Sequence, residues 1–333
     1  SPMRFIADLH IHSKYSRACS PQLTLENIDA WCRIKGVDIV SCADFTHPFW
    51  FNELRTKLVP SQYPGLYQLK PGLAPSFAPP SYPPLAKGGS GGVRPTLFVM
   101  GTELACIYSQ GGKKARRVHL CIFAPSLEVV KKINQMLLAR GAKLASDGRP
   151  ILGMSSKKLL ELILEADPRC VMIPAHVWTP WFAIFGSESG FDSLEECFGD
   201  LAPHIFAIET GVSSDPPMNW RVKMLDQVAL VSHSDSHSLP NLGREANVFE
   251  GEEKNLSYNS IMEAIKNASP VKRKELGISP KKNDIGGRAG MVSRLGGTSA
   301  AEIRAPVSTS RTSPNAVRLD VRGSRIAGLG SRS

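Results

Sequence analysis

Short apolar runs alternate with longer segments of helical periodicity along most of the chain. Residues 5–9 form an apolar run that predicts a short buried strand. Residues 24–35 place apolar side chains at helical spacing, between a candidate N-cap at Thr24 and a glycine, Gly36, at the other end. Residues 37–42 are mostly apolar again and predict a second strand. The order strand, helix, strand is typical of a β/α fold.

The same alternation recurs towards the C-terminus. Further strands are predicted at residues 96–101, 118–123, 170–174, 205–209 and 228–231, and further helices at residues 127–139, 156–165 and 257–266. These units, roughly seven in number, suit a single barrel-like domain of the α/β class.

Two segments fall outside this pattern. Residues 70–95 are rich in proline and glycine and predict a surface loop that contributes nothing to the core. Residues 271–333 contain no aromatic residue and no sustained apolar period, so we expect a disordered tail. A frameshifted or misassembled terminus would have the same composition, and both origins of the tail stay open. Residues 1–2 are interpreted as left over from cloning, which places the folded domain at residues 3–270.

The net charge of +10 belongs almost entirely to the terminal segment. Residues 271–333 contain 13 Lys or Arg and 4 Asp or Glu, so they carry +9 and the rest of the chain carries +1. Basic charge therefore gives only weak support for nucleic-acid binding by the domain itself.

Composition excludes some classes of protein and indicates a compartment. No apolar run approaches the roughly 18 to 20 residues of a membrane span, and the first residues lack the features of a signal peptide. Seven cysteines are scattered without a C-x-x-C pair. We therefore expect reduced thiols in a cytoplasmic protein, no zinc ribbon and no membrane partner.

Residues able to bind metal ions gather at the ends of the predicted strands. They are the histidines His10, His12, His47, His119, His176 and His237, and the carboxylates Asp44, Glu103 and Asp235. In a β/α barrel the C-terminal strand ends converge on one face, and an H-x-H or D-x-H on extended backbone points both side chains to one side. A lone histidine is more often a surface or hydrogen-bonded core residue, but the joint pattern predicts a cluster for Zn²⁺, Mn²⁺ or Fe²⁺.

Several segments resemble the PHP family of metallo-phosphoesterases, named for polymerase and histidinol phosphatase. DLHIHSKYS at residues 8–16 looks like the first motif of the family, and ADFTHP, GTE, VHL, PAHVWTPW and SDSHS look like the others in order. The stretches ETGVSSDPPMNWR and SDSHSLPNLGREAN resemble the endonuclease Q branch in particular. The resemblance covers residues 3 to about 268, apart from the proline-rich loop. It implies a distorted (β/α)7 barrel of PHP type that holds up to three metal ions.

The resemblance also implies two ligand sets that share one carboxylate. These sets are His10, His12, Glu103 and Asp235 for one ion, and Glu103, His119 and His176 for a second. A third ion would be served by His237 and by the Asp44/His47 segment, and which of Asp44 and His47 is the ligand stays open. Many relatives have an acidic residue or histidine where this chain has Ala18, which weakens the third site. The expected cofactors are two to three divalent ions (Zn²⁺, Mn²⁺, Mg²⁺ or Fe²⁺).

Divalent ions held in this way favour hydrolysis of a phosphodiester by activated water, without a serine or cysteine nucleophile. The expected catalytic residues are Asp235, His237 and His176. The resemblance implies an endonuclease of DNA repair that cuts DNA on the 5′ side of deaminated bases (uracil, hypoxanthine, xanthine) or at abasic sites. DNA with deaminated bases is therefore the expected partner, and the sequence identifies no repair or replication-clamp protein.

Candidate substrate-binding residues flank the metal-binding motifs. They are Lys14, Tyr15, Trp178, Trp181, Arg221 and Arg244. Recognition of a damaged base requires stacking walls, which the aromatic residues could supply, although aromatic residues as commonly fill cores. The basic residues are placed to contact phosphates. Residues 111–117 form a basic turn, for which a solvated hairpin tip is the simpler interpretation than a DNA contact.

Two alternatives to the endonuclease stay open. The same ions could hydrolyse a small phosphomonoester of the histidinol-phosphate type, or the domain could be a scaffold without activity, as in some polymerase-associated PHP domains. Endonuclease Q relatives also carry a cysteine-rich zinc module and a helical C-terminal region. Neither is recognisable in this sequence, so we expect impaired engagement of duplex DNA.

Overall fold

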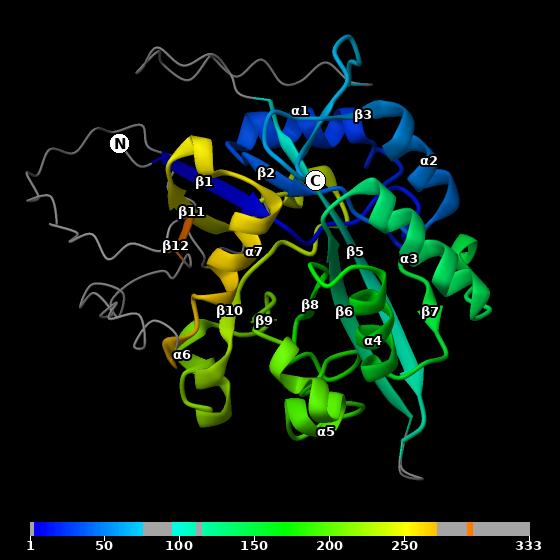
Figure 1. Cartoon of the computed structure of the whole chain (residues 1–333), viewed down its shortest axis with the longest axis vertical. Coiled ribbons are helices and arrows are strands. Elements are labelled where there is room, and N and C mark those ends of the chain that lie inside the picture. Colours follow the sequence, from blue (N-terminus) through cyan, green and yellow to red (C-terminus); the bar gives the residue numbers. More distant parts are fainter. Residues whose placement is uncertain (1–2, 76–94, 111–114, 272–291, 296–333) are drawn as a thin grey trace, which may run out of the picture.

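The computed structural model describes residues 3–75, 95–110, 115–271 and 292–295 (Figure 1). The strands are β1 (Met3–Asp8), β2 (Ile39–Ser41), β3 (Leu58–Pro60), β4 (Tyr67–Leu69), β5 (Leu97–Tyr108), β6 (Arg116–Ala124), β7 (Ile151–Leu152), β8 (Val171–Pro174), β9 (Ala207–Glu209), β10 (Ala229–Val231), β11 (Asn247–Gly251) and β12 (Val292–Leu295). The α-helices are α1 (Leu25–Lys35), α2 (Pro48–Lys57), α3 (Leu127–Ala139), α4 (Ser156–Ala166), α5 (Leu194–Phe198), α6 (Pro216–Asn219) and α7 (Tyr258–Lys266). Short 3-10 helices are η1 (Leu144–Ser146), η2 (Gly199–His204), η3 (Lys223–Gln227), η4 (Leu239–Asn241) and η5 (Glu253–Asn255).

Strand pairing in the larger, ten-stranded sheet is mixed. β1, β2 and β5 are parallel neighbours at its centre. β11 pairs antiparallel with β1 on one side, and β6 and β8 continue antiparallel beyond β5 on the other. Every residue of β2 and β8 is buried, as expected of strands covered on both faces. The predicted α/β class with a multi-strand sheet is thus confirmed.

A closed (β/α)7 barrel is not present among the described residues, because strand pairing does not run full circle. β9 and β10, of three residues each, form a separate parallel pair. Single hydrogen bonds connect this pair to the larger sheet: the His12 amide donates to the Ser236 carbonyl (3.0 Å), and the Val177 amide donates to the Glu209 carbonyl (3.1 Å). Both contacts lie where strands end, so the two sheets meet at the edge that carries the candidate site.

The hairpin of β5 and β6 departs most from the predicted alternation of strands and helices (Figure 1). A strand of 12 residues pairs antiparallel with one of 9 residues, with Glu103 opposite Cys121 and Ala105 opposite His119. Both strands are almost wholly buried, so they lack the polar alternation that marks a half-exposed hairpin. Because side chains two residues apart share a face, Glu103 and His119 project from the same face of the hairpin.

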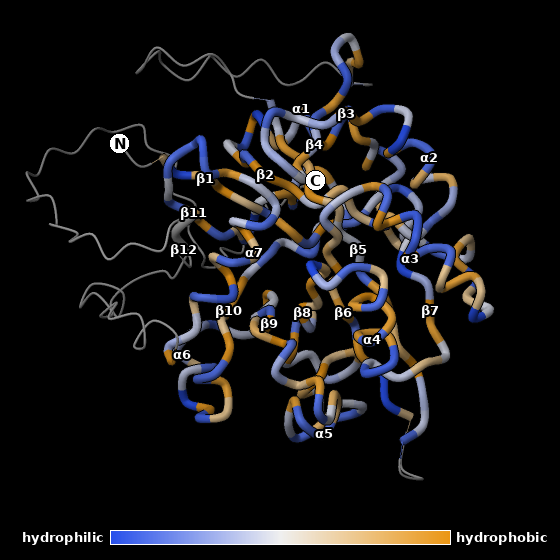
Figure 2. Tube along the Cα trace, viewed as in Figure 1, coloured by the Kyte–Doolittle hydropathy of each residue, from blue (hydrophilic) through white to orange (hydrophobic). Residues whose placement is uncertain are grey.

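The helices cover the sheet with their apolar faces, and Figure 2 shows the hydrophobic positions concentrated along the strands. The predicted helices correspond to α1, α3, α4 and α7. The predicted ends of α1 are confirmed: Thr24 accepts a hydrogen bond from the Asn27 amide, and Gly36 adopts a positive φ of 71°. Helix α2 was not predicted, although Pro48 stands at its first turn, a position that tolerates proline.

The expectations for the proline-rich loop, the basic turn and the tail fall partly on residues outside the described ranges. Residues 76–94 of the proline-rich loop, 111–114 of the basic turn, and most of the predicted tail lie outside them. Within that tail, β12 pairs parallel with β11, where no regular structure was predicted.

All seven cysteines are free thiols. None of the described helices has the length and apolar character needed to cross a bilayer.

Trp50 fixes α2 to the strand end that leads to Asp44. Its side chain is fully buried, and its Nε1 donates hydrogen bonds to the carbonyl oxygens of Cys42 and Ala43, at 2.9 Å each. We predict that Trp50→Ala lowers the free energy of unfolding by about 3–5 kcal/mol, measured by urea denaturation. Phe49→Ala, at a neighbour that is 65% exposed, should change it by less than about 0.5 kcal/mol. Equal effects of the two substitutions would contradict this role for Trp50.

Candidate metal centre

The H-x-H and D-x-H segments lie side by side. Residues 10–12 follow β1, and residues 235–237 lie a few positions beyond β10. Their middle residues, Ile11 and Ser236, form an isolated parallel bridge. This bridge fixes the register between the two segments, and the side chains of Asp235 and His237 both lie next to His12.

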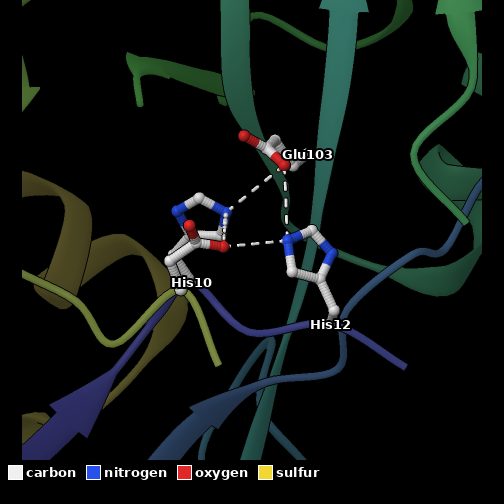
Figure 3. Close-up of side chains that lie close together, drawn as sticks. His10, His12 and Glu103 are labelled. Carbon is white, nitrogen blue, oxygen red and sulfur yellow. Dashed lines mark hydrogen bonds and ion pairs between the residues drawn. The ribbon is translucent and has the colours of Figure 1, made fainter. Parts of the chain in front are cut away.

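The first ligand group contains His10, His12, Glu103 and Asp235. Figure 3 shows the first three pointing toward one another, and Asp235 completes the group. His12 Nε2 lies 3.0 Å from Asp235 Oδ1 and 3.3 Å from Glu103 Oε2. His10 Nε2 lies 3.6 Å from the same two oxygens, is buried, and has no hydrogen-bond partner. A buried imidazole nitrogen left free beside two carboxylates fits a divalent cation.

The second ligand group contains Glu103, His119 and His176. Glu103 Oε1 lies 3.0 Å from His119 Nδ1 and 3.2 Å from His176 Nε2. The two imidazole nitrogens lie 3.2 Å apart. The other carboxylate oxygen, Oε2, faces the first group, so Glu103 presents one oxygen to each group.

Glu209 connects the two groups from the interior side. Its Oε1 lies 3.0 Å from His10 Nδ1 and 2.8 Å from His233 Nδ1, while Oε2 accepts the backbone amide of His176 (2.8 Å). A carboxylate on the second nitrogen of a metal-binding imidazole fixes its tautomer and its orientation. Glu209 was not predicted as a site residue. It ends a predicted strand, the same signal that marked the proposed ligands.

Three predicted ligands have a positive φ: Asp44 (41°), His176 (30°) and Asp235 (45°). Such backbone costs roughly 1–3 kcal/mol for a residue other than glycine, and it persists where the surroundings determine it. At His176 the surroundings include Gly211, where an added Cβ would lie 2.7 Å from the His176 Cβ. The fold therefore maintains backbone strain at three positions of the centre.

Asp44, and not His47, faces the first ligand group. Asp44 Oδ1 lies 3.3 Å from His12 Nδ1, and its Oδ2 accepts hydrogen bonds from the amide (2.7 Å) and hydroxyl (2.6 Å) of Ser13. The ring of His47 instead stacks on Tyr15, with ring centroids 4.3 Å apart. Asp44 therefore contacts an imidazole of the group, whereas His47 contacts an aromatic side chain.

His237 lies at the solvent side of the centre. Its ring centroid is 4.5 Å from that of His12, and its Nδ1 lies 2.9 Å from the Asp235 carbonyl oxygen. Within the described part of the chain, His237, Asp44 and His47 do not form a third group as close-set as the two above. The third ion therefore stays a prediction.

Burial and neighbouring charges shift the pKa values of the cluster in opposite directions. Burial raises the pKa of Glu103, but the charges of His119 and Arg149 help to hold it well below its ordinary value. Burial lowers the pKa of His12, but hydrogen bonds to carboxylates, led by Asp235, raise it well above its ordinary value. Burial lowers the pKa of His119 to about 4. Without metal ions, protons on some imidazoles balance the carboxylates.

Three of the predicted substrate-binding residues have internal partners. Lys14 Nζ and the Tyr15 hydroxyl both contact the carboxylate of Glu53, at 2.8 and 3.1 Å. Trp178 packs against the hydrophobic core, and its Nε1 donates a hydrogen bond to Asn219 Oδ1 (2.7 Å). Trp178 therefore contributes to the core as well as lying next to a proposed ligand segment.

The other three predicted substrate-binding residues are exposed. Trp181 is 48% exposed, and the guanidinium of Arg117 lies 5.1 Å from its ring centroid. Arg244 Nε donates a hydrogen bond to the Ser234 carbonyl (2.8 Å), next to the D-x-H segment. Arg221 lies on the surface just after α6.

Comparisons with known proteins find similar sequences and similar solved structures. No family model matches the chain. The uncharacterized protein YqxK of Bacillus subtilis is 28% identical over 254 residues, which are 73% of this chain and 58% of that protein. The crystal structure of the lesion-specific endonuclease PfuEndoQ from Pyrococcus furiosus has a TM-score of 0.63 and 27% identity, covering 80% of this chain and 56% of that one.

A second solved structure is endonuclease Q in complex with a 27-mer duplex that carries an abasic lesion at the active site. It has a TM-score of 0.63 and 28% identity, covering 80% of this chain and 57% of that one. The resemblance to endonuclease Q is thus confirmed in both sequence and structure. The chain spans little more than half the length of these proteins.

We predict that Glu209→Gln weakens Mn²⁺ binding by about 10- to 100-fold, measured by isothermal titration calorimetry. The neutral amide loses the charge that orients the His10 and His233 imidazoles. Its NH2 group also cannot accept the His176 amide as Oε2 of the carboxylate does. Glu196→Gln is the matched control, because the Glu196 carboxylate pairs with Arg116 away from the centre (2.7 Å). Wild-type affinity in Glu209→Gln would contradict the orienting role.

Metal affinity should also rise with pH. Imidazoles bind metal ions only when neutral, and the pKa of His12 lies well above its ordinary value of 6.5. Protons therefore compete with the ion near neutral pH, and the competition weakens as pH rises. We expect tighter Mn²⁺ binding at pH 8 than at pH 6, with protons released on binding, measured by calorimetry in buffers of different ionisation enthalpy. Equal affinities without proton release would be inconsistent with the described ligands.

Proposed function

We propose that the chain is a metal-dependent endonuclease that hydrolyses a phosphodiester of DNA on the 5′ side of deaminated bases or at abasic sites. The observation that supports this most directly is the carboxylate of Glu103. It is buried and presents one oxygen to each of two ligand groups. Paired groups that share a carboxylate are suited to two divalent ions acting on one phosphate.

The first ion would be held by His10, His12, Glu103 and Asp235, and the second by Glu103, His119 and His176. Divalent cations bound there would lower the pKa of a water molecule and stabilise negative charge on a phosphate ester. The imidazole-rich donor set favours Zn²⁺, Mn²⁺ or Fe²⁺ over Ca²⁺ or Mg²⁺. The completeness of both groups argues against the scaffold without activity.

Two of the proposed catalytic residues combine contact with the centre and access to solvent. The side chains of Asp235 and His237 are 26% and 32% exposed. The Asp235 carbonyl can only accept a hydrogen bond, so Nδ1 of His237 carries the proton and Nε2 has a free lone pair. Burial lowers the pKa of His237, which keeps Nε2 unprotonated at neutral pH. His237 is therefore suited to accept a proton or to bind a third ion.

His176, the third proposed catalytic residue, is held from three sides. Its Nε2 lies 3.2 Å from Glu103 Oε1, its Nδ1 lies 3.0 Å from Thr179 Oγ1, and its backbone amide donates to Glu209 Oε2 (2.8 Å). A side chain fixed at both ring nitrogens and at its backbone is preorganised for one position. We assign it the role of a ligand that sets the geometry of the second group.

The assignment of DNA and of the lesion rests on similarity. The two solved structures with 27–28% identity are a lesion-specific endonuclease and an endonuclease Q bound to duplex DNA with an abasic lesion. The exposed ring of Trp181, close to the second ligand group in sequence, offers a stacking surface for an unpaired base. A cytoplasmic location belongs to the same proposal and agrees with seven free thiols.

The test is cleavage of duplexes that carry uracil, hypoxanthine, xanthine or an abasic site, next to an undamaged duplex, with Mn²⁺ supplied. We expect a nick 5′ to each lesion. Asp235→Ala removes a proposed metal ligand and should lower the cleavage rate by more than about 100-fold. This loss is larger than the roughly 10- to 100-fold expected when a residue hydrogen-bonded to a ligand is replaced. The control Asp200→Ala alters an exposed carboxylate paired with Lys157 and should cleave normally.

Three results would count against parts of the proposal. Full activity of Asp235→Ala would eliminate the described centre as the site of cleavage. Equal cleavage of damaged and undamaged duplexes would remove the lesion selectivity. Hydrolysis of histidinol phosphate in the absence of any DNA cleavage would favour the small-molecule phosphatase.

A further inference from the structure

We propose that Arg149 binds the phosphate that is cleaved, as a residue of the substrate site next to the two ligand groups. Neither the metal-binding motifs nor the predicted substrate-binding residues include it. The inference rests on the phosphodiester chemistry proposed above, and it names the group on the chain that would recognise the charged part of the substrate.

The guanidinium of Arg149 reaches the shared carboxylate of the centre. Its Nη1 lies 2.8 Å from Glu103 Oε2, the oxygen that also faces His10 and His12. Among the arginines and lysines that the structure describes, Arg149 alone forms an ion pair with a carboxylate of the ligand groups. Its side chain is 22% exposed, so part of it is accessible to solvent while Nη1 contacts the centre.

The turn that carries Arg149 is fastened to the first motif. The Gly148 amide donates to the Tyr15 carbonyl (2.9 Å), and Asp147 Oδ1 accepts the amides of Arg149 (2.9 Å) and Arg17 (3.3 Å). These bonds fix residues 147–149 against the segment that contains the H-x-H pair. The guanidinium is therefore held at the centre by its backbone and not by the ion pair alone.

Two further contacts leave this turn little freedom. A Cβ added at Gly148 would overlap Asp44 Oδ2 and Ser16 Oγ, so glycine permits the close approach of the turn to the centre. On the other side, the Ala105 amide donates to the Pro150 carbonyl (3.2 Å), two residues beyond Glu103 on β5. The turn is thus anchored on both sides of Arg149, as expected of a preorganised binding residue.

Charge indicates what this guanidinium would bind. The carboxylates around the centre are Asp44, Glu103, Glu209 and Asp235. Arg149 interacts electrostatically with Glu103, Asp235 and Asp147. Two divalent cations would compete with it for the carboxylates of Glu103 and Asp235. When metal ions bind Glu103, they would repel the positive guanidinium beside them. An anion bound by both the ions and the guanidinium would offset this repulsion.

A phosphodiester supplies that anion. It carries one negative charge, and its two free oxygens match the planar fork of donors on a guanidinium. A phosphate between Arg149 and the ions would separate these positive charges and hold the ester on the solvent side of Glu103. The ion pair of Arg149 with Glu103 then keeps the side chain in place when no substrate is bound.

The test compares Arg149→Met and Arg149→Lys with the wild type. Calorimetry measures the affinity of each metal-free protein for Mn²⁺. It then measures the affinity of each Mn²⁺-loaded protein for inorganic phosphate. We expect Arg149→Met to bind Mn²⁺ at least as tightly as the wild type, because a positive charge beside Glu103 is removed. It should bind phosphate about 10- to 100-fold more weakly, the effect of losing charge-assisted hydrogen bonds. Arg149→Lys should be intermediate, because a lysine keeps the charge and loses the fork.

A matched control is Arg33→Met, which removes an arginine paired with Asp29 on α1 (3.0 Å) and should change neither affinity. Unchanged phosphate affinity in Arg149→Met would overturn the inference. So would an equal loss of Mn²⁺ and phosphate affinity, because Arg149 would then act on the ligands and not on the anion.

The inference and the proposed function can fail separately. If the wild type nicks lesion-bearing duplexes and Arg149→Met binds phosphate and cleaves equally well, the endonuclease stands and the role of Arg149 is refuted. If the wild type binds Mn²⁺ and phosphate but cuts no DNA, and Arg149→Met loses the phosphate, Arg149 is supported and the endonuclease is refuted.

Discussion

A buried carboxylate without direct access to water is the constraint on which the candidate site depends. Glu103 is 1% exposed, yet its charged form is favoured, because imidazoles and Arg149 surround both of its oxygens. An isolated charge at this depth would cost several kcal/mol in lost hydration. The neighbourhood must therefore always supply positive charge, as protons on histidines such as His12 or as metal ions. The same arrangement suits divalent cations, and it explains why proton release should accompany metal binding.

This requirement shapes the backbone around the centre. The side chains that compensate Glu103 come from the ends of β1 and β8, from β6 and from the turn before β7. Asp235 joins them from beyond the end of β10, so these elements must meet at one edge even though strand pairing does not close. Single hydrogen bonds from His12 and Val177 make that junction. Beyond it, Asp44, His176 and Asp235 all take a positive φ, which places their side chains at a cost that the packing has to offset.

Much of the site was predictable, because its strongest signals are local. H-x-H on extended backbone places two side chains on one face whatever the fold, and histidines at strand ends follow from the apolar runs before them. The D-x-H segment departs from this rule, because Asp235 has a positive φ. The basic turn at residues 111–117 was interpreted as a hairpin tip, but the lengths of the two strands were underestimated, since β5 has 12 residues and β6 has 9. Their pairing brings His119 to the face of Glu103.

Glu209 and Arg149 were not predicted as site residues, and both act through contacts between segments far apart in the sequence. They differ in where they lie relative to the centre. Glu209 lies on the interior side, where it is buried and orients imidazoles of both groups. Arg149 lies on the outer side, with Asp235 and His237, and these three side chains are 22–32% exposed, whereas the side chains of His10 and Glu103 are at most 1% exposed. The centre is therefore most exposed on the side of these three side chains. A phosphate that approaches from this side would meet Arg149 before it reaches the oxygens of Glu103.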